Sequence, residues 1–148
     1  MNKFLFYSPD GGEIIDSKKN NLKDTIYNSL FDKNIFEEYW YNGTNTAELI
    51  YYKDNEIISQ LLISIGDYGI FLHFINEKES KVSLYNDKKL NEIYENLEDL
   101  GISIGLYLPK ELAWIAIKEF LETGNATDKI HWMFTYYIDN NYPNAEYI

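Results

Sequence analysis

The sequence predicts an α+β domain, in which a mostly antiparallel sheet of about five to seven strands carries two main helices packed on one face. Two observations support this prediction. Between residues 36 and 85 the apolar residues recur with a period of two and are interrupted by short turn sequences, as in strands joined by hairpins. A segment with helical spacing of apolar residues lies on each side of this stretch.

The first strand and the first helix have clear boundaries in the sequence. Phe4–Tyr7 is a short apolar run that ends at the turn sequence Ser8–Gly12. Asn21 can cap the helix that follows, with Asp24 three residues later. The apolar stripe of this helix ends near Asn34 and should lie on the sheet. It consists of Leu22, Ile26, Tyr27, Leu30 and Phe31.

The middle of the chain predicts a meander of strands. Its connections, residues 42–45, 54–55 and 66–69, are short and rich in asparagine, aspartate and glycine, so neighbouring strands should pair antiparallel. The expected strands are residues 36–41, 46–53, 56–65, 70–75 and 81–85.

The last third predicts a helix and a final strand. Residues 87–100 can form either a short helix or a loop, and residues 101–108 should be extended. Pro109 opens a helix that stops at Gly124. Its buried face should comprise Ala113, Ala116, Ile117, Phe120 and Leu121. The alternation of Ile130, Trp132, Phe134 and Tyr136 with polar and mixed residues predicts a strand with one buried face.

Composition indicates one domain over residues 1–148 that can fill a core, since 45% of the residues are hydrophobic. The net charge of −11 repels nucleic acid and attracts basic proteins, although acidity can also serve solubility alone. There is no cysteine, no signal-like run and no apolar stretch of membrane-spanning length. We therefore expect a cytoplasmic protein without disulfides or membrane contact.

Catalytic and metal motifs are weak. Residues 101–105 match the letters Gly-x-Ser-x-Gly, but no helix follows Ser103 directly as a nucleophile elbow requires. His73 and His131 stand alone on expected strands, without metal-ligand spacing, and the acidic pairs have no diagnostic pattern. We expect neither an enzyme nor a cofactor.

Aromatic residues make up 17% of the chain, more than one core must bury, so some should be exposed beside carboxylates. Such neighbours suit an interface with a basic protein, although packing in the core or at a sheet edge can also occupy each ring. The residues expected to bind a partner are Glu37, Glu38, Tyr39, Tyr41, Tyr52, Asp67 and Tyr68.

Residues 108–124, which read Leu-Pro-Lys-Glu-Leu-Ala-Trp-Ile-Ala-Ile-Lys-Glu-Phe-Leu-Glu-Thr-Gly, followed by Ile130-His131-Trp132, resemble the end of immunity protein family one of bacterial polymorphic toxin systems. The resemblance implies a protein that binds and neutralises a cognate toxin domain, such as a basic nuclease or deaminase, by obstructing its active site. The motif residues themselves should be structural: Phe120 and Leu121 bury the helix, Gly124 ends it, and Trp132 fills the sheet face below.

Other functions remain open at this point. An acidic mimic of nucleic acid or a general protein-interaction module would share the charge, and a small hydrolase would use Ser103 or a carboxylate pair. The free protein is expected to be a monomer or a weak dimer.

Overall fold

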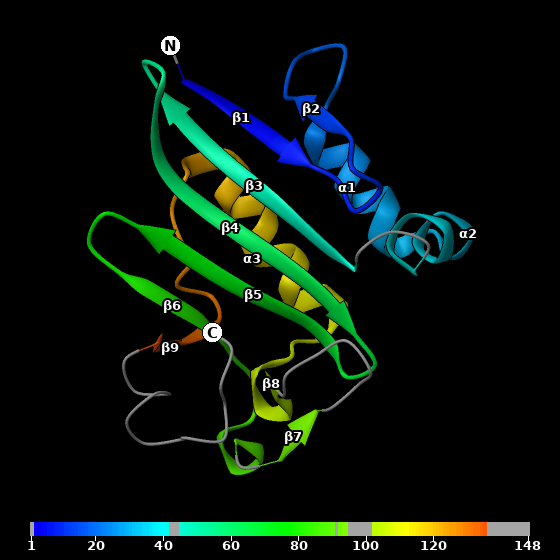
Figure 1. The fold of residues 1–148 in the computed structure, drawn as a ribbon, viewed down its shortest axis with the longest axis vertical. Helices are drawn as coiled ribbons and strands as arrows, with labels where there is room; N and C mark the ends of the chain where they lie inside the picture. Colours follow the sequence, from blue (N-terminus) through cyan, green and yellow to red (C-terminus); the bar gives the residue numbers. More distant parts are fainter. Residues whose placement is uncertain (1, 42–44, 91, 95–101, 136–148) are drawn as a thin grey trace.

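The predicted α+β class is confirmed. The computed structural model describes residues 2–41, 45–90, 92–94 and 102–135. Within these residues, seven strands form one sheet in the order β2-β1-β3-β4-β5-β6-β9, and every neighbouring pair is antiparallel (Figure 1). A two-stranded ribbon, β7-β8, stands apart from it.

The elements follow the chain in a simple order. The strands are β1 (Asn2–Tyr7), β2 (Glu13–Ile15), β3 (Thr46–Lys53), β4 (Glu56–Gly66), β5 (Gly69–Asn76), β6 (Ser80–Leu84), β7 (Ile93–Tyr94), β8 (Ile102–Ser103) and β9 (His131–Phe134). The helices are α1 (Leu22–Phe31), α2 (Lys33–Phe36) and α3 (Lys110–Thr123), with a π-helical turn η1 (Glu37–Tyr41) and 3-10 turns η2 (Asp87–Lys89) and η3 (Ile104–Leu106).

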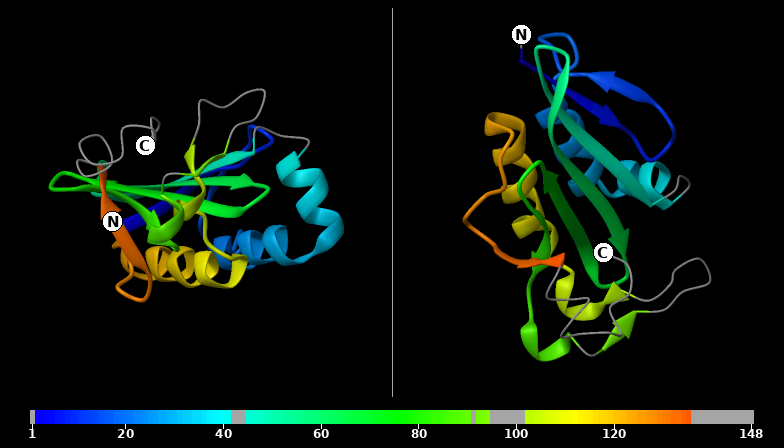
Figure 2. Two further views of the ribbon diagram at one scale, coloured as in Figure 1. Left: turned by 90° about the horizontal axis from the view of Figure 1, so that it is seen from below. Right: turned by 60° about the vertical axis from the view of Figure 1, so that its left-hand side comes forward.

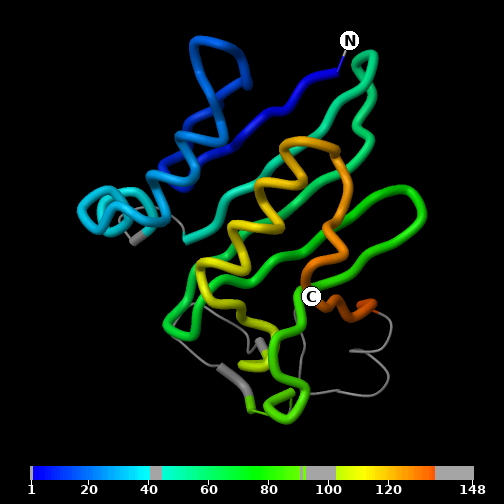
Figure 3. The backbone as a smooth tube through the Cα atoms, turned by 180° about the vertical axis from the view of Figure 1, so that it is seen from behind, coloured from blue at the N-terminus to red at the C-terminus, as the bar shows by residue number. Residues whose placement is uncertain are grey.

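Both long helices cover the same face of the sheet. α1 and α3 lie together beneath the strands in the left view of Figure 2, and α3 lies over the strands and runs roughly along them when seen from behind (Figure 3). The strands contribute one fully buried cross-strand row, Phe6, Leu49, Leu61 and Phe74. The helices contribute Leu22, Ile26, Leu30, Ala113, Ala116, Ile117, Phe120 and Leu121, all of them predicted.

The start of α1 and both ends of α3 are confirmed, whereas α1 ends at Phe31, before the end expected near Asn34. The Asn21 side chain accepts a hydrogen bond from the backbone N–H of Asp24 at 3.2 Å. Pro109 precedes α3, and Gly124 ends it in the left-handed conformation with φ 74°. The Ser59 hydroxyl on β4 donates to the carbonyl of Gly124, which attaches the end of α3 to the sheet.

The strand predicted at residues 36–41 is wrong, because this segment is helical. The Asp32 carboxylate accepts hydrogen bonds from the N–H groups of Asn34 and Ile35 and so caps α2. Phe36 and Trp40 are four residues apart, and Trp40 is completely buried on the core. The helical spacing was hidden in a run of aromatic residues.

Three further expectations need correction. Residues 101–108 are not extended throughout, because the short strand β8 passes into the turn η3 at Ile104. Where a short helix or a loop was expected at residues 87–100, the described residues form the turn η2 and the short strand β7, and residues 91 and 95–101 lie outside the described part. In β9 no single face is buried: Phe134 is 45% exposed, since β9 is an edge strand paired only with β6, and Tyr136 lies outside the described residues.

A second, smaller core lies on the other face of the sheet at its β5-β6 side. Phe71 and Val82 alternate with residues that face the helices, and they pack with side chains from the segment between β6 and α3. These are Leu90, Leu106 and Tyr107. This segment therefore covers part of the face that the helices leave free. No helix among the described residues is long and apolar enough to cross a membrane.

Replacing Gly124 with alanine should destabilise the protein more than the same change at Gly11. Both residues have positive φ, 74° and 89°, which strains alanine by roughly 1–2 kcal/mol. A Cβ at Gly11 meets nothing within 4 Å, whereas at Gly124 it would lie 2.3 Å from the Tyr51 ring and add about 1–3 kcal/mol of overpacking. Urea denaturation measures both losses, and equal losses would show that the ring moves aside without cost.

Candidate binding surface

The side chains that alternate with the main core form what we call the open face of the sheet. Side chains of successive strand residues point to opposite faces, so Tyr7 and Glu48 point away from the helices when Phe6 and Leu49 point towards them. The register aligns two rows on this face. The acid row is Glu13, Tyr7, Glu48, Leu62 and His73, and the apolar row is Ile15, Leu5, Ile50, Gln60 and Ile75.

The two rows differ in chemistry and in exposure. In the apolar row Leu5 and Ile50 are buried, whereas Ile15 on the edge strand β2 is 50% exposed. In the acid row Tyr7 is 39% exposed and stands between two carboxylates, directly opposite Glu13 on β2 and Glu48 on β3. The apolar row is therefore mostly sheltered and exposes Ile15 at the edge of the sheet, beside the acid row.

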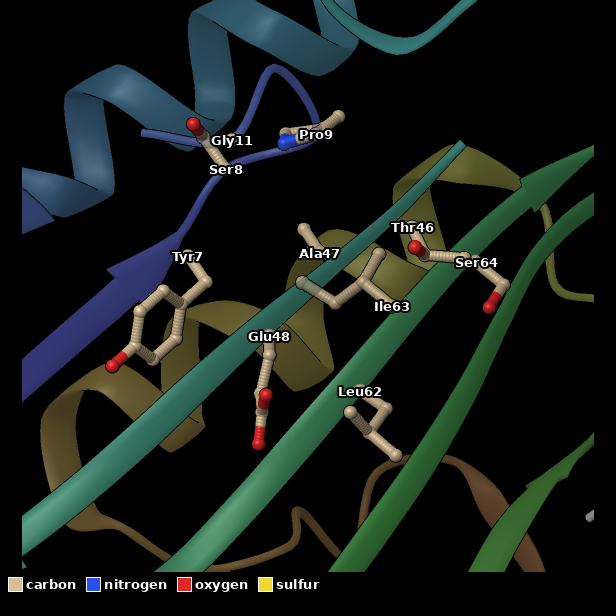
Figure 4. Close-up of a pocket in the computed structure, with 10 residues that line it drawn as sticks. All are labelled: Tyr7, Ser8, Pro9, Gly11, Thr46, Ala47, Glu48, Leu62, Ile63 and Ser64. Atoms are coloured by element: carbon tan, nitrogen blue, oxygen red, sulfur yellow. The ribbon is translucent and has the colours of Figure 1, made fainter. Parts of the chain in front are cut away.

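A hollow of about 500 Å³ lies beside the middle of the acid row. Tyr7, Glu48 and Leu62 lie along it, and the turn that leaves β1 at Ser8 forms one wall (Figure 4). The remaining lining comes from Pro9, Gly11, Thr46, Ala47, Ile63 and Ser64. Strands β3 and β4 thus supply the floor, and the turn between β1 and β2 supplies the rim.

Hydrogen bonds within the turn hold this rim in place. The N–H of Gly12 donates to the Ser8 hydroxyl at 2.9 Å and to the Asp10 carboxylate at 3.1 Å, and the Ser8 hydroxyl itself donates to Asp10. The backbone closes the same loop, since the N–H of Ser8 donates to the carbonyl of Gly12 at 2.9 Å. The hydrogen bond from Ser8 is the main reason why the pKa of Asp10 is lowered.

The acid row carries negative charge that no lysine neutralises within the described residues. Burial raises the pKa of Glu48, and no described residue forms an ion pair or hydrogen bond with its carboxylate. The pKa of Tyr7 is raised chiefly by the Glu13 carboxylate, then by burial, and further by Tyr52 and Glu48. The ion pairs of Lys23 and Lys129 are made elsewhere, with acidic residues of α3.

A second hollow, of about 230 Å³, adjoins the turn on its other side. Asp10, Ile35, Glu38 and Tyr39 line it. Burial is the largest cause of the raised pKa of Tyr39, and the Asp10 carboxylate adds to it. The turn at Asp10 therefore separates two acidic and aromatic hollows, one on the sheet and one against η1.

The residues predicted to bind a partner do not form one patch. Glu37, Glu38, Tyr39 and Tyr41 lie on η1, where Glu38 and Tyr39 border the second hollow; the side chain of Tyr41 lies outside the described part. Tyr52 lies at the far end of β3 under the Lys3 ammonium, 5.1 Å from its ring centroid. Asp67 and Tyr68 form the β4-β5 turn. The β4 residue that pairs with Tyr52 lies ten positions before Asp67, so the turn is roughly 30 Å from Tyr52 along the strand.

Sequence reasoning missed Tyr7, Glu13 and Glu48. A signal for Glu48 was present, because it is a charge inside the expected strand 46–53 between Ala47 and Leu49. The neighbours of Glu48 in the row could not be predicted from the sequence, because Tyr7 and Glu13 are brought beside it only by the register of β1 with β2 and β3.

The residues of the resembling motif take structural positions. Phe120 packs edge-on against Phe4 and Phe74, and Leu121 is buried beside it. Trp132 packs against the Phe74 ring, and its indole N–H donates to the carbonyl of Thr127 at 2.7 Å. These side chains position α3 and β9 on the sheet.

The other motif residues offer little chemistry. Ser103 is completely buried and its hydroxyl donates to the carbonyl of Leu90 at 2.6 Å, so this hydroxyl does not reach the surface. The His73 Nε2 atom lies 2.7 Å from the Ser80 hydroxyl, and burial lowers the His73 pKa. Among the described residues, no group of three or more histidines or carboxylates is placed to hold a metal ion.

Comparisons of the chain with models of protein families and with curated proteins found no match. The candidate surface is therefore assigned from the geometry and charge of this chain alone.

Replacing Glu48 with glutamine should leave the free energy of unfolding at pH 7 unchanged or raise it, by less than about 0.5 kcal/mol because water still screens the carboxylate. Burial raises the folded pKa above its ordinary value of 4.5, so the folded protein binds the proton more tightly and the ionised form opposes folding. Any gain in the free energy of unfolding from Glu48→Gln should therefore be present at neutral pH and vanish as the pH falls below 4.5.

Urea denaturation of both proteins at pH 7 and at a pH below 4.5 measures the difference in the free energy of unfolding. Glu38→Gln removes one negative charge from an exposed position on η1 and is the matched control for net charge. A clear loss of stability in Glu48→Gln at pH 7 would mean that the carboxylate has a favourable partner within the fold.

Proposed function

We propose that this chain is an immunity protein, which binds a basic toxin domain with its open face and obstructs the toxin's active site. The observation that carries the proposal is the open face itself. It joins an apolar row to an acid row in which Glu48 has no cationic partner among the described residues.

The two rows suit the two parts of a protein interface. Exposed aliphatic and aromatic side chains, such as Ile15 and Tyr7, give contact area that excludes water at the centre. Carboxylates without cations, such as Glu48, favour a partner that brings lysine or arginine. With a net charge of −11 the whole molecule also attracts such a partner at long range and speeds its association.

The resemblance of residues 108–124 and 130–132 to immunity protein family one supports the kind of partner. The resembling residues lie in α3 and β9, within or against the core, so they would define the fold while the open face defines the target. This division suits a family in which each member meets a different toxin.

Co-expression tests the proposal directly. The chain should form a stable one-to-one complex with the C-terminal domain of the protein encoded next to it, and it should restore growth to cells that this domain inhibits. Size-exclusion chromatography and growth curves measure the two results. An unrelated protein of similar positive charge is the control, and equal binding to it would favour an acidic mimic of nucleic acid instead. Absence of both complex and rescue would refute the proposal.

A matched pair of substitutions tests the face. Ile15→Lys places a positive charge on the apolar row, and Ile115→Lys makes the same change on α3, away from the open face. Ile15→Lys should weaken the complex at least about tenfold, as expected for a buried interface residue replaced by a repelling charge. Ile115→Lys should change the affinity less than about twofold. Calorimetric titration measures both, and the reverse order would place the interface on the helical side.

A further inference from the structure

The hollow beside Glu48 has a composition that selects one kind of side chain. Tyr7 stands between Glu13 and Glu48 on adjacent strands, so one aromatic residue lies between two acidic ones, whose strands are about 10 Å apart. Leu62 follows Glu48 in the same row and offers an apolar surface on the hollow's other side. The site thus combines negative charge, a ring and an aliphatic wall.

A cation is the complement of this site. The Glu48 carboxylate is partly withdrawn from water and has no ion pair with any described residue. The second hollow is different, because its Asp10 carboxylate already accepts hydrogen bonds from Ser8 and Gly12. The second hollow also carries Glu38, but that residue is exposed to water, whereas Glu48 in the hollow on the sheet is partly buried.

Among cationic side chains, arginine fits best. Its planar guanidinium can stack on an aromatic ring such as Tyr7 and donate two parallel hydrogen bonds to a carboxylate such as Glu48. It also loses its hydration more easily than the ammonium of lysine, which is a compact, strongly hydrated charge. The methylene stem of arginine would lie along Leu62.

We infer that the hollow lined by Tyr7, Glu48 and Leu62 is a binding site for a guanidinium group, and that the toxin's arginine fills it in the complex. The second half of this inference rests on the function proposed above, whereas the first half concerns the free protein alone. Glu48 then acts as the residue that selects arginine over other side chains, and Tyr7 as the surface on which the group stacks.

The experiment uses n-propylguanidinium as the probe and follows the amide NMR signals of the full chain. We expect saturable shifts centred on Tyr7, Glu48 and Leu62. The neutral isostere n-propylurea should give no saturable shift there, and n-butylammonium should bind several-fold more weakly. Shifts that are absent, scattered over the surface, or equal for n-propylurea would overturn the inference.

Variants separate the two roles. Glu48→Gln should weaken the probe at least about tenfold, because the charged hydrogen bonds are lost. Tyr7→Leu should weaken it about two- to fivefold, and Tyr7→Phe should restore binding because the ring remains. Glu38→Gln, which removes a charge from the second hollow, should leave the affinity within about twofold. Unchanged binding by Glu48→Gln, with an amide spectrum that shows a folded protein, would overturn the assignment of Glu48.

The probe and the co-expression experiment fail separately. If n-propylguanidinium binds as expected but no neighbouring toxin domain forms a complex, the guanidinium site stands and the immunity function falls. If the complex forms and the probe does not bind, the immunity function stands and the site is wrong.

Discussion

The constraint on which the structure depends is that both long helices occupy the same face of the sheet. α1 and α3 bury Phe6, Leu49, Leu61 and Phe74 from four adjacent strands, and each such side chain contributes about 1.5–3 kcal/mol when it leaves water. Because side chains alternate along each strand, every residue committed to this core places its neighbours on the opposite face. The open face is therefore a necessary consequence of the core.

The described residues cover only part of that opposite face. The segment between β6 and α3 closes it over Phe71 and Val82 and builds the second core there. Over β1, β3 and β4, Leu5 and Ile50 are buried, and no helix of the described residues packs on them. The exposed side chain of Ile15 and the carboxylate of Glu48, whose ionised form burial disfavours, are local conflicts of the kind that is expected at a functional site.

Charge is distributed unevenly over the two sides of the molecule. Lysines near α3 form ion pairs, as Lys23 does with Glu122 and Lys129 with Glu119. On the acid row Glu13 and Glu48 flank Tyr7, and Glu48 has no ion pair with a described residue. A basic partner would therefore find unpaired acceptors on the sheet side and pairs already made on the helical side, which favours one orientation of docking.

The sequence by itself determined the α+β class, the start of α1, the ends of α3 and the bounds of β3 to β6 within one residue, because apolar periodicity, Asn21, Pro109 and Gly124 act over a few residues. It failed at residues 36–41, where consecutive aromatic residues fit either period and burial of Trp40 decided for a helix. Only the tertiary structure decided the candidate site. Glu13, Tyr7 and Glu48 come from three strands, and a shift of one residue in the register of β1 would turn Tyr7 into the core. That register is set by packing under α1 and α3, which depends on contacts between segments far apart in the chain.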